Sequence, residues 1–194
     1  MSGERGFWMR WRVRLGYPVA VIYWLAASPT TKFIAMGGLI AAFGLIVRAM
    51  AAGHLKKSEE LTTSGLYSQT RNPLYFGSSL LAMGFAVAGH SWIAGAIIVI
   101  YFAVFYYAVM RNEERELRAR YSAAFEAYEA RVPLFFPRIS GGGSDAAPQG
   151  LQRQFSWEQY KRNREYRALI GTIAALGLMW LRMWLPAAAE FIRR

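Results

Sequence analysis

The sequence RNPLYFGS, residues 71–78, places an arginine and a helix-start signal directly before an uncharged apolar stretch. Pro73 suits the first turn of a helix, where its missing N–H would have no partner, and Asn72 is a favoured N-cap residue. Gly77 lets another backbone or a flat ligand approach closely. A capped helix start explains these residues structurally. Arg71 beside free helix N–H groups also offers a site for a carboxylate.

A pair of glutamates, Glu113 and Glu114, follows the next apolar stretch. Residues 73–89 and 92–110 are uncharged and are joined by the short connection GHSW, which predicts an antiparallel helical hairpin. The hairpin returns both glutamates to the depth of Arg71, where carboxylates provide partners for an ammonium group. The arrangement predicts a pocket for a zwitterionic ligand. A solvated first turn of a surface helix is the structural alternative for the glutamates.

The composition indicates that the hairpin lies in lipid. The chain has 194 residues, of which 55% are hydrophobic and 18% are charged, against roughly 45–50% apolar and about 25% charged in soluble domains. A bilayer crossing needs about 20 apolar residues. We therefore predict an all-α, polytopic helical membrane protein with about five transmembrane helices plus a cytoplasmic amphipathic helix. The apolar segments that support this prediction are residues 15–28, 33–50, 73–89, 92–110 and 168–185.

Changes in composition divide the chain into four parts. Residues 1–50 are predicted to form an N-terminal helical hairpin, whose short first segment is bracketed by prolines, and residues 51–138 form the core. Residues 139–152 are a flexible linker by composition. Residues 153–194 hold a basic amphipathic segment and the last apolar segment, in which Arg182 is expected to snorkel to the lipid head groups.

Two helix faces carry further patterns. From residue 113 to residue 131, apolar side chains recur at helical spacing with charges on the other faces, which predicts an amphipathic helix at the membrane surface. In GGLIAAFG, Gly37 and Ala41 lie one turn apart and permit close contact between helices. Packing within the bundle explains this pair, and a homodimer seam is the alternative.

The formal charge of +11 comes from basic clusters at the ends of the apolar segments. This distribution argues against nucleic acid as a partner and follows the rule that Lys and Arg gather on the cytoplasmic side of membranes. We predict an integral protein of a bacterial inner membrane or the endoplasmic reticulum, with its site facing the cytoplasm. The sequence has no cysteine and two histidines, His54 and His90. Thiol chemistry is thus excluded, and a histidine-rich metal site is not expected.

The order of these motifs resembles the integral-membrane methyltransferase superfamily, which includes isoprenylcysteine carboxyl methyltransferases and phospholipid N-methyltransferases. The parts that carry the resemblance are GLYSQTRNPLYFGS, the apolar hairpin, EERELRARYSAAFEAYEARVP and FPR, within residues 48–138. Asn72 departs from the isoprenylcysteine pattern, which has histidine there, and is similar to the phospholipid branch. The tail that ends in FPR looks more like the isoprenylcysteine branch. The methyl acceptor therefore stays open between the two.

The resemblance implies a binding site for S-adenosylmethionine. The residues that it places at this cofactor are Tyr67, Arg71, Asn72, Pro73, Tyr75, Gly77, Glu113 and Glu114. Arg71 and Glu114 are also expected to act in catalysis, together with Arg131. The last of these matches a basic position near the acceptor and would hold a carboxylate or a lipid phosphate, although snorkelling explains it as well.

Tyrosines near the hairpin ends have two interpretations. Aromatic faces stabilise a sulfonium cation without competing as nucleophiles, and aromatic residues also form belts at membrane interfaces. We expect the first role for Tyr75 and the belt for Tyr106 and Tyr107.

The implied function is S-adenosylmethionine-dependent methyl transfer to a membrane-embedded, lipid-like acceptor, either an isoprenylcysteine-type carboxylate or a phospholipid amine. A carboxylate is already a nucleophile at pH 7, whereas an amine must first lose a proton, so the lack of a clear base slightly favours the carboxylate. An NADPH-dependent reductase that resembles membrane sterol reductases is one alternative. A non-enzymatic membrane scaffold or lipid-binding protein, in which the motifs only cap helices, is the other.

Overall fold

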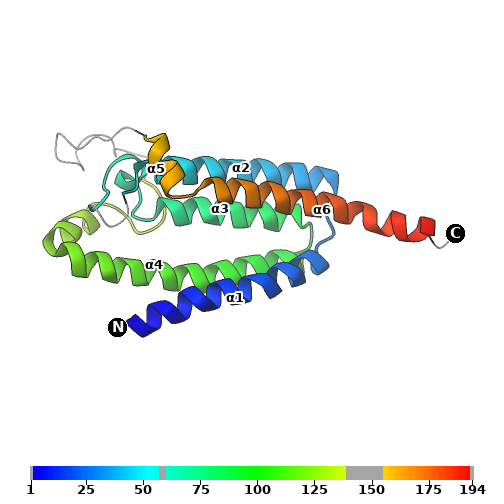
Figure 1. Ribbon diagram of the computed structural model, residues 1–194, viewed down its shortest axis with the longest axis horizontal. Coiled ribbons are helices and arrows are strands. Elements are labelled where there is room, and N and C mark those ends of the chain that lie inside the picture. The colour runs from blue at the N-terminus through cyan, green and yellow to red at the C-terminus, as the bar shows by residue number, and fades with distance from the viewer. Residues whose placement is uncertain (1, 57–59, 139–154, 193–194) are drawn as a thin grey trace.

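Helices and connecting loops make up the described part of the protein (Figure 1). The structure, a computed structural model, describes residues 2–56, 60–138 and 155–192. The all-α class is confirmed for these ranges, and the predicted linker 139–152 lies outside them. The helices are α1 (Ser2–Ala26), α2 (Thr31–His54), the 3-10 turn η1 (Gly65–Ser68), α3 (Pro73–Ala88), α4 (Trp92–Glu129), α5 (Trp157–Arg162) and α6 (Tyr166–Ile192).

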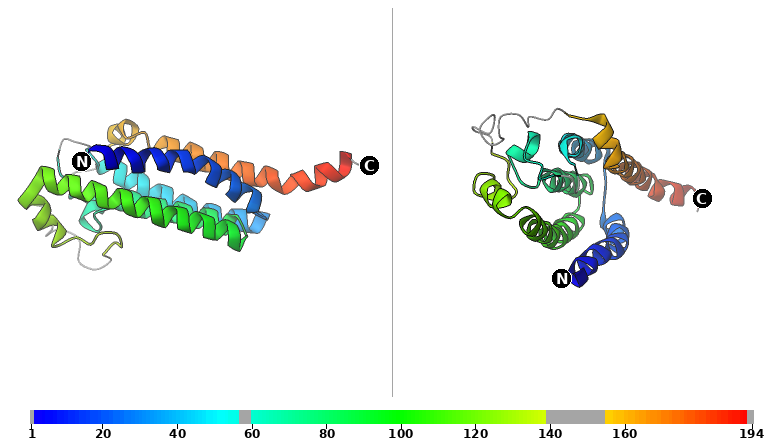
Figure 2. Two further views of the ribbon diagram at one scale, coloured as in Figure 1. Left: turned by 90° about the horizontal axis from the view of Figure 1, so that it is seen from below. Right: turned by 60° about the vertical axis from the view of Figure 1, so that its left-hand side comes forward.

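The long helices form two layers. In Figures 1 and 2, α2, α3 and α6 lie in one layer, and α1 and α4 lie in the other. Within the layers α2 packs on α3 and α6 and α1 packs on α4, and the packing of α3 on α4 joins the two layers. The two helices of the predicted N-terminal hairpin thus find different main partners. The α3–α4 hairpin forms as expected, with Gly89, His90 and Ser91 in its turn and Ser91 capping α4.

Glycines allow α2 and α3 to approach to backbone contact. A Cβ atom added to Gly84 of α3 would lie 2.6 Å from the carbonyl oxygen of Gly37 and 2.8 Å from the backbone nitrogen of Ala41. Gly44 of α2 lies against Gly77 of α3 in the same interface. A Cβ atom added to Gly44 would lie 2.7 Å from the Gly77 carbonyl oxygen. The small residues of α2 therefore serve packing within the bundle. The possible homodimer through small-residue helix faces stays a prediction.

Among the described residues, two helices are long and apolar enough to cross a membrane, namely α2 and α4, and α3 is a shorter apolar helix. Large apolar side chains stand exposed along these helices, including Leu39 and Phe43 of α2 and Ile93 and Ile100 of α4. Lipid is the solvent that makes such exposure favourable. Membrane association is thus supported, whereas the predicted number of five crossings stays unconfirmed. The first helix is longer than expected, since Pro18 lies inside α1 rather than at its boundary.

The predicted amphipathic helix continues the membrane helix as the second half of α4. The helical backbone is interrupted at Ser122, with φ 38° and ψ −115°. The chain turns there, and the helix ends at Glu129. The apolar side chains Phe125 and Tyr128 pack with Val132 and Leu61 in a small core. This face therefore packs on the loops at the end of the bundle, and the expected position of the helix at the membrane surface stays a prediction.

The C-terminal helix is attached to the end of α1. Arg182 donates hydrogen bonds to the carbonyl oxygens of Ala27 (3.0 Å) and Leu25 (2.8 Å), and its guanidinium lies 4.8 Å from the ring centroid of Trp24. The last carbonyls of a helix favour a cation. Arg182 therefore caps α1, and its expected snorkelling to the lipid head groups stays a prediction.

Candidate functional site

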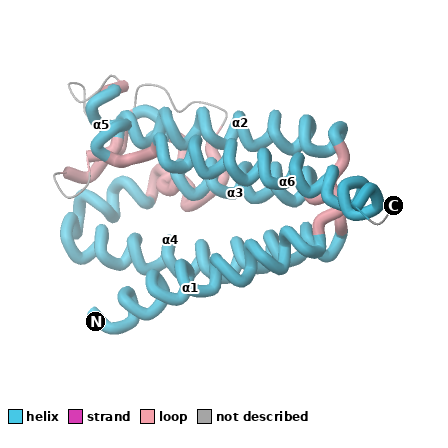
Figure 3. The backbone as a smooth tube through the Cα atoms, turned by 45° about the vertical axis from the view of Figure 1, so that its right-hand side comes forward, coloured by secondary structure: helices cyan, strands magenta, loops and turns pink. Residues whose placement is uncertain are grey.

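The candidate site lies at the end of the bundle where the loops before α3 and after α4 meet, the same end at which α5 lies (Figure 3). The backbone N–H of Arg71 donates to the Pro133 oxygen (2.9 Å), and the Thr70 hydroxyl donates to the Phe135 oxygen (2.9 Å). The Asn72 side-chain amide donates to the Leu134 oxygen (3.0 Å). These bonds fix the helix entrance to the segment that follows α4.

Asn72 occupies the N-cap position of α3 but does not cap it with its side chain. Its amide is directed to Leu134 instead, which corrects the predicted N-cap bond. Pro73 does stand in the first turn of α3, as expected. Asn72 therefore acts as a tie between the two loops, and the first N–H groups of α3 are not satisfied by its side chain.

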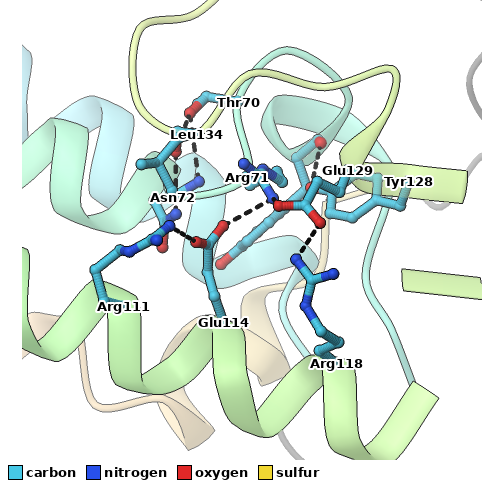
Figure 4. Close-up of polar contacts among 10 residues, drawn as sticks. Thr70, Arg71, Asn72, Arg111, Glu114, Arg118, Tyr128, Glu129 and Leu134 are labelled. Atoms are coloured by element: carbon cyan, nitrogen blue, oxygen red, sulfur yellow. Dashed lines mark hydrogen bonds and ion pairs between the residues drawn. The ribbon is translucent and has the colours of Figure 1, made fainter. Parts of the chain in front are cut away.

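A buried ion-pair network is built on Arg71 (Figure 4). Its Nη1 lies 2.8 Å from Oε1 of Glu114 and 2.7 Å from Oε1 of Glu129. Glu114 is also paired with Arg111 (3.1 Å), and Glu129 with Arg118. The side chains of Arg71, Glu114 and Glu129 are 9%, 7% and 28% exposed. The predicted approach of Arg71 to Glu114 is thus confirmed as a geometric fact.

Two atoms in this network are buried without a hydrogen-bond partner in the described part of the chain, namely Nε of Arg71 and Oε1 of Glu114. The second atom keeps its ion-pair distance to Arg71 but lacks hydrogen-bond geometry. Leaving a buried donor or acceptor unsatisfied costs about 1–3 kcal/mol. One buried donor and one buried acceptor of neighbouring side chains thus lack a hydrogen-bond partner among the described residues.

The tyrosines at this end have different surroundings. Tyr67 is buried, its carbonyl oxygen accepts the hydroxyl of Tyr128 (2.7 Å), and burial raises the pKa of the Tyr67 phenol, which stays neutral. Tyr75 meets Tyr106 edge to face, with ring centroids 5.6 Å apart. Tyr106 thus packs on Tyr75, the residue that is expected to contact the sulfonium. Tyr107 is exposed, as expected for a residue of an aromatic belt.

Three further residues that were expected at the site have other surroundings, namely Gly77, Glu113 and Arg131. Glu113 is exposed on the face of α4 that its neighbour Glu114 does not share. Gly77 faces α2, so that the close approach it permits is that of a helix and not of a ligand. Arg131 is exposed, and its Nε donates to the Ala127 oxygen (3.0 Å) at the end of α4. Their roles at a cofactor or acceptor stay predictions.

The network contains three residues that sequence reasoning missed, Arg111, Arg118 and Glu129. Arg111 and Glu114 lie three residues apart on one helix, a spacing at which side chains of opposite charge often pair. Arg118 and Glu129 lie on opposite sides of the Ser122 break. An uninterrupted helix would have kept these two side chains apart, so their contact could not be predicted from their spacing in the sequence.

Acid is expected to weaken this corner of the protein. A hydrogen bond from Arg71, with a further contribution from Arg118, holds the pKa of Glu129 below its ordinary value of 4.5. A carboxyl with a depressed pKa in the folded state stabilises the fold at pH values above its unfolded pKa, and this contribution is lost as pH falls below that value. Thermal unfolding in detergent should therefore show a loss of stability below about pH 4.5 that is smaller in Glu129→Gln. Identical acid profiles for the two proteins would contradict this assignment.

Part of this site lies in a segment that matches a known protein family. Residues 33–124, which include the entrance of α3 and Glu114 of the network, match the family model described as phospholipid methyltransferase. The matched segment is therefore similar to that of membrane methyltransferases. The resemblance to the integral-membrane methyltransferase superfamily is thereby confirmed, and the matched segment includes the hairpin with Arg71 and Glu114 at its two ends.

Two curated bacterial proteins are similar to the chain. The nickel-cobalt-cadmium resistance protein NccN of Alcaligenes xylosoxydans xylosoxydans is 40% identical over 85 residues, which cover 44% of this chain and 39% of that protein. The cobalt-zinc-cadmium resistance protein CzcN of Cupriavidus metallidurans is 31% identical over 137 residues, 67% of this chain and 63% of that protein. The chain thus spans less than two thirds of the length of either relative. No solved structure matches the chain.

Proposed function

We propose that this protein transfers a methyl group from S-adenosylmethionine to a lipid-like acceptor in the membrane. The observation that carries the proposal is the buried pair of Arg71 and Glu114, which joins the two ends of the matched hairpin and leaves one donor and one acceptor atom unsatisfied. A purely structural ion pair would be expected to satisfy both atoms within the protein.

The residues of the network fit the polar end of S-adenosylmethionine. Nε of Arg71, with a positively charged guanidinium, is suited to the carboxylate of a methionyl group, and Oε1 of Glu114 is suited to its ammonium. Tyr75 offers an aromatic face for a sulfonium close to this pair. When bound, the cofactor would supply an electrophilic methyl carbon.

The remaining task of the protein is to position the acceptor and exclude water. The acceptor nucleophile takes the methyl carbon while the sulfur keeps the electron pair of the bond that breaks, so alignment of the reactants contributes more than covalent help. Apolar faces of α3 and α4 border the site and suit an acceptor that arrives from the bilayer. We expect Arg131, exposed at the end of α4, to contact an anionic group of that acceptor.

Calorimetry on the purified protein in detergent tests cofactor binding. Wild-type protein should bind S-adenosylmethionine and S-adenosylhomocysteine, and Arg71→Ala or Glu114→Ala should weaken binding at least about tenfold, since each removes a charge-assisted contact worth about 1.5–3 kcal/mol. Glu116→Ala, an exposed residue of the same helix, is the matched control and should bind normally.

The same measurement separates the rival functions. Binding of NADPH with no response to either methyl-donor ligand would favour a reductase and overturn the proposal. A folded protein that binds none of the three would favour a scaffold. A radiolabelled methyl donor, added to native membranes that contain the protein, would then identify the acceptor. Base lability of the label distinguishes a methyl ester from a methylated amine.

The names of the two relatives suggest a physiological setting for this reaction. Both are named for resistance to cobalt and cadmium, together with nickel in one case and zinc in the other. We infer that methylation of a membrane component by this protein supports growth in the presence of such metals. A deletion strain complemented with wild-type protein or with Glu114→Ala should show metal tolerance only with the wild type.

A further inference from the structure

A second ion pair joins the C-terminal segment to the membrane helices. Arg48 of α2 donates from Nε to Oε2 of Glu165 (3.0 Å) and from Nη2 to Oε1 (2.8 Å). Its Nη1 donates to the carbonyl oxygen of Leu74 (3.4 Å) and to the hydroxyl of Ser78, both on α3. The side chains of Arg48 and Glu165 are 19% and 11% exposed. Arg48 is thus a fully engaged guanidinium in an apolar environment.

Arg48 of α2 lines a cavity whose other lining residues come from α3, α4 and α6. The cavity has a volume of about 320 Å³, and its lining is mostly apolar, with Leu81, Phe85 and Phe102 among the side chains. Tyr106 also lines it and packs on Tyr75, three residues after Asn72. Glu114 of the Arg71 network follows Tyr106 on the same helix by eight residues, about 12 Å.

The C-terminal segment holds Glu165 in place independently of the cavity. The Asn163 side chain donates to the carbonyl oxygens of Ala52 (2.8 Å) and Leu55 (2.9 Å) at the end of α2, and the Ser156 N–H donates to Gly53 (3.1 Å). Arg164, with φ 57°, forms the turn that precedes Glu165. This segment lies outside the part that matches the family, residues 33–124.

We propose that Glu165 is a specificity-determining residue, which neutralises Arg48 at the polar end of this cavity and so selects amphiphiles whose part beside Arg48 is uncharged. The inference rests on the proposed function, in which the cavity holds the apolar chain of the methyl acceptor. It adds the class of acceptor that the cavity accepts, namely a single apolar chain without an oxyanion at the depth of Arg48.

Electrostatics supports this selection. An unpaired guanidinium beside an apolar cavity would bind any carboxylate or phosphate strongly, because charges interact more strongly where water is excluded. Glu165 occupies both the Nε and the Nη2 side of Arg48, so a second anion would meet a carboxylate at short range. The carboxylate of Glu165 therefore disfavours an oxyanion beside Arg48. An apolar chain is then the favoured occupant of the cavity.

Binding of three amphiphiles of equal alkyl chain length tests the inference: a neutral alkyl glycoside, an alkyl phosphate and an alkyltrimethylammonium. Displacement of a fluorescent fatty-chain probe would be measured with the full chain in nanodiscs. Wild-type protein should prefer the glycoside. Glu165→Gln, which keeps the shape but removes the charge, should raise affinity for the alkyl phosphate at least about tenfold, equivalent to about 1.4 kcal/mol, and leave the glycoside unchanged. Arg48→Gln should favour the alkyltrimethylammonium.

Two further variants separate charge selection from structural damage. The double variant Arg48→Gln with Glu165→Gln is again neutral and should return to the wild-type order of preference. Asn163→Ala removes the attachment to α2 but keeps the ion pair, so that it should lower stability without changing selectivity. Equal loss of all three amphiphiles in Glu165→Gln would overturn the inference, and so would a preference that is unchanged. The proposed function fails separately, if wild-type protein does not bind S-adenosylmethionine while the charge-dependent switch is present.

Discussion

Replacing Gly84 by alanine is expected to destabilise the protein strongly, although glycine to alanine inside a helix ordinarily stabilises by about 0.5–1 kcal/mol. The added Cβ would lie 2.6 Å from the Gly37 oxygen and 2.8 Å from the Ala41 nitrogen, both backbone atoms that no rotamer change can move. Overpacking of this kind costs about 1–3 kcal/mol, and more where backbones must separate. Thermal unfolding in detergent should show a lower midpoint, and combination with Gly37→Ala should lower it further.

Gly177 of α6 is the matched control, because an added Cβ there has nothing within 4 Å. Gly177→Ala should therefore leave the midpoint unchanged or raise it. If Gly84→Ala behaved like Gly177→Ala, the backbone contact of α2 with α3 would not exist in the folded protein. The sign of the change, and not only its size, thus tests the arrangement of the helices that support the site.

The spacing of small residues on α2 predicted this helix contact but not its partner. Gly37 and Ala41 indicate only that some backbone approaches them, since the same pattern serves a bundle and a dimer. The contact with Gly84 depends on how α3 is rotated, which follows from the turn around His90 and from the hydrogen bond of Ser28 to the Gly89 oxygen. Such tertiary contacts are not encoded in the spacing of one helix.

Contacts within the site could be predicted from the sequence where they depend on the hairpin alone. The meeting of Arg71 with Glu114 follows from two apolar stretches of similar length joined by a short turn, so it was readable in the sequence. The contacts of Glu129 and Glu165 were not, because the first depends on the backbone break at Ser122 and the second on the return of the chain to α2 after residue 154. The polar residues that the sequence did not predict at these contacts are therefore those whose positions depend on irregular backbone.

The second large effect is expected at the Arg71–Glu114 pair. Arg71→Met would leave the buried carboxylates of Glu114 and Glu129 without their shared cation, and breaking a buried pair from one side costs about 3–5 kcal/mol. Arg111→Met, which removes an exposed partner of Glu114, should cost much less. Thermal unfolding of the two variants in the same detergent compares these costs directly.

The double variant Arg71→Met with Glu114→Met separates a structural role from a binding role. An apolar pair of similar volume often replaces a buried ion pair at little cost, so the double variant should be more stable than Arg71→Met alone, with a coupling of about 0.5–3 kcal/mol. If the pair only holds the helix ends together, the recovered fold should bind S-adenosylmethionine normally. We expect the opposite, a folded protein without measurable binding, because Nε of Arg71 and Oε1 of Glu114 are the unsatisfied atoms that the ligand would use.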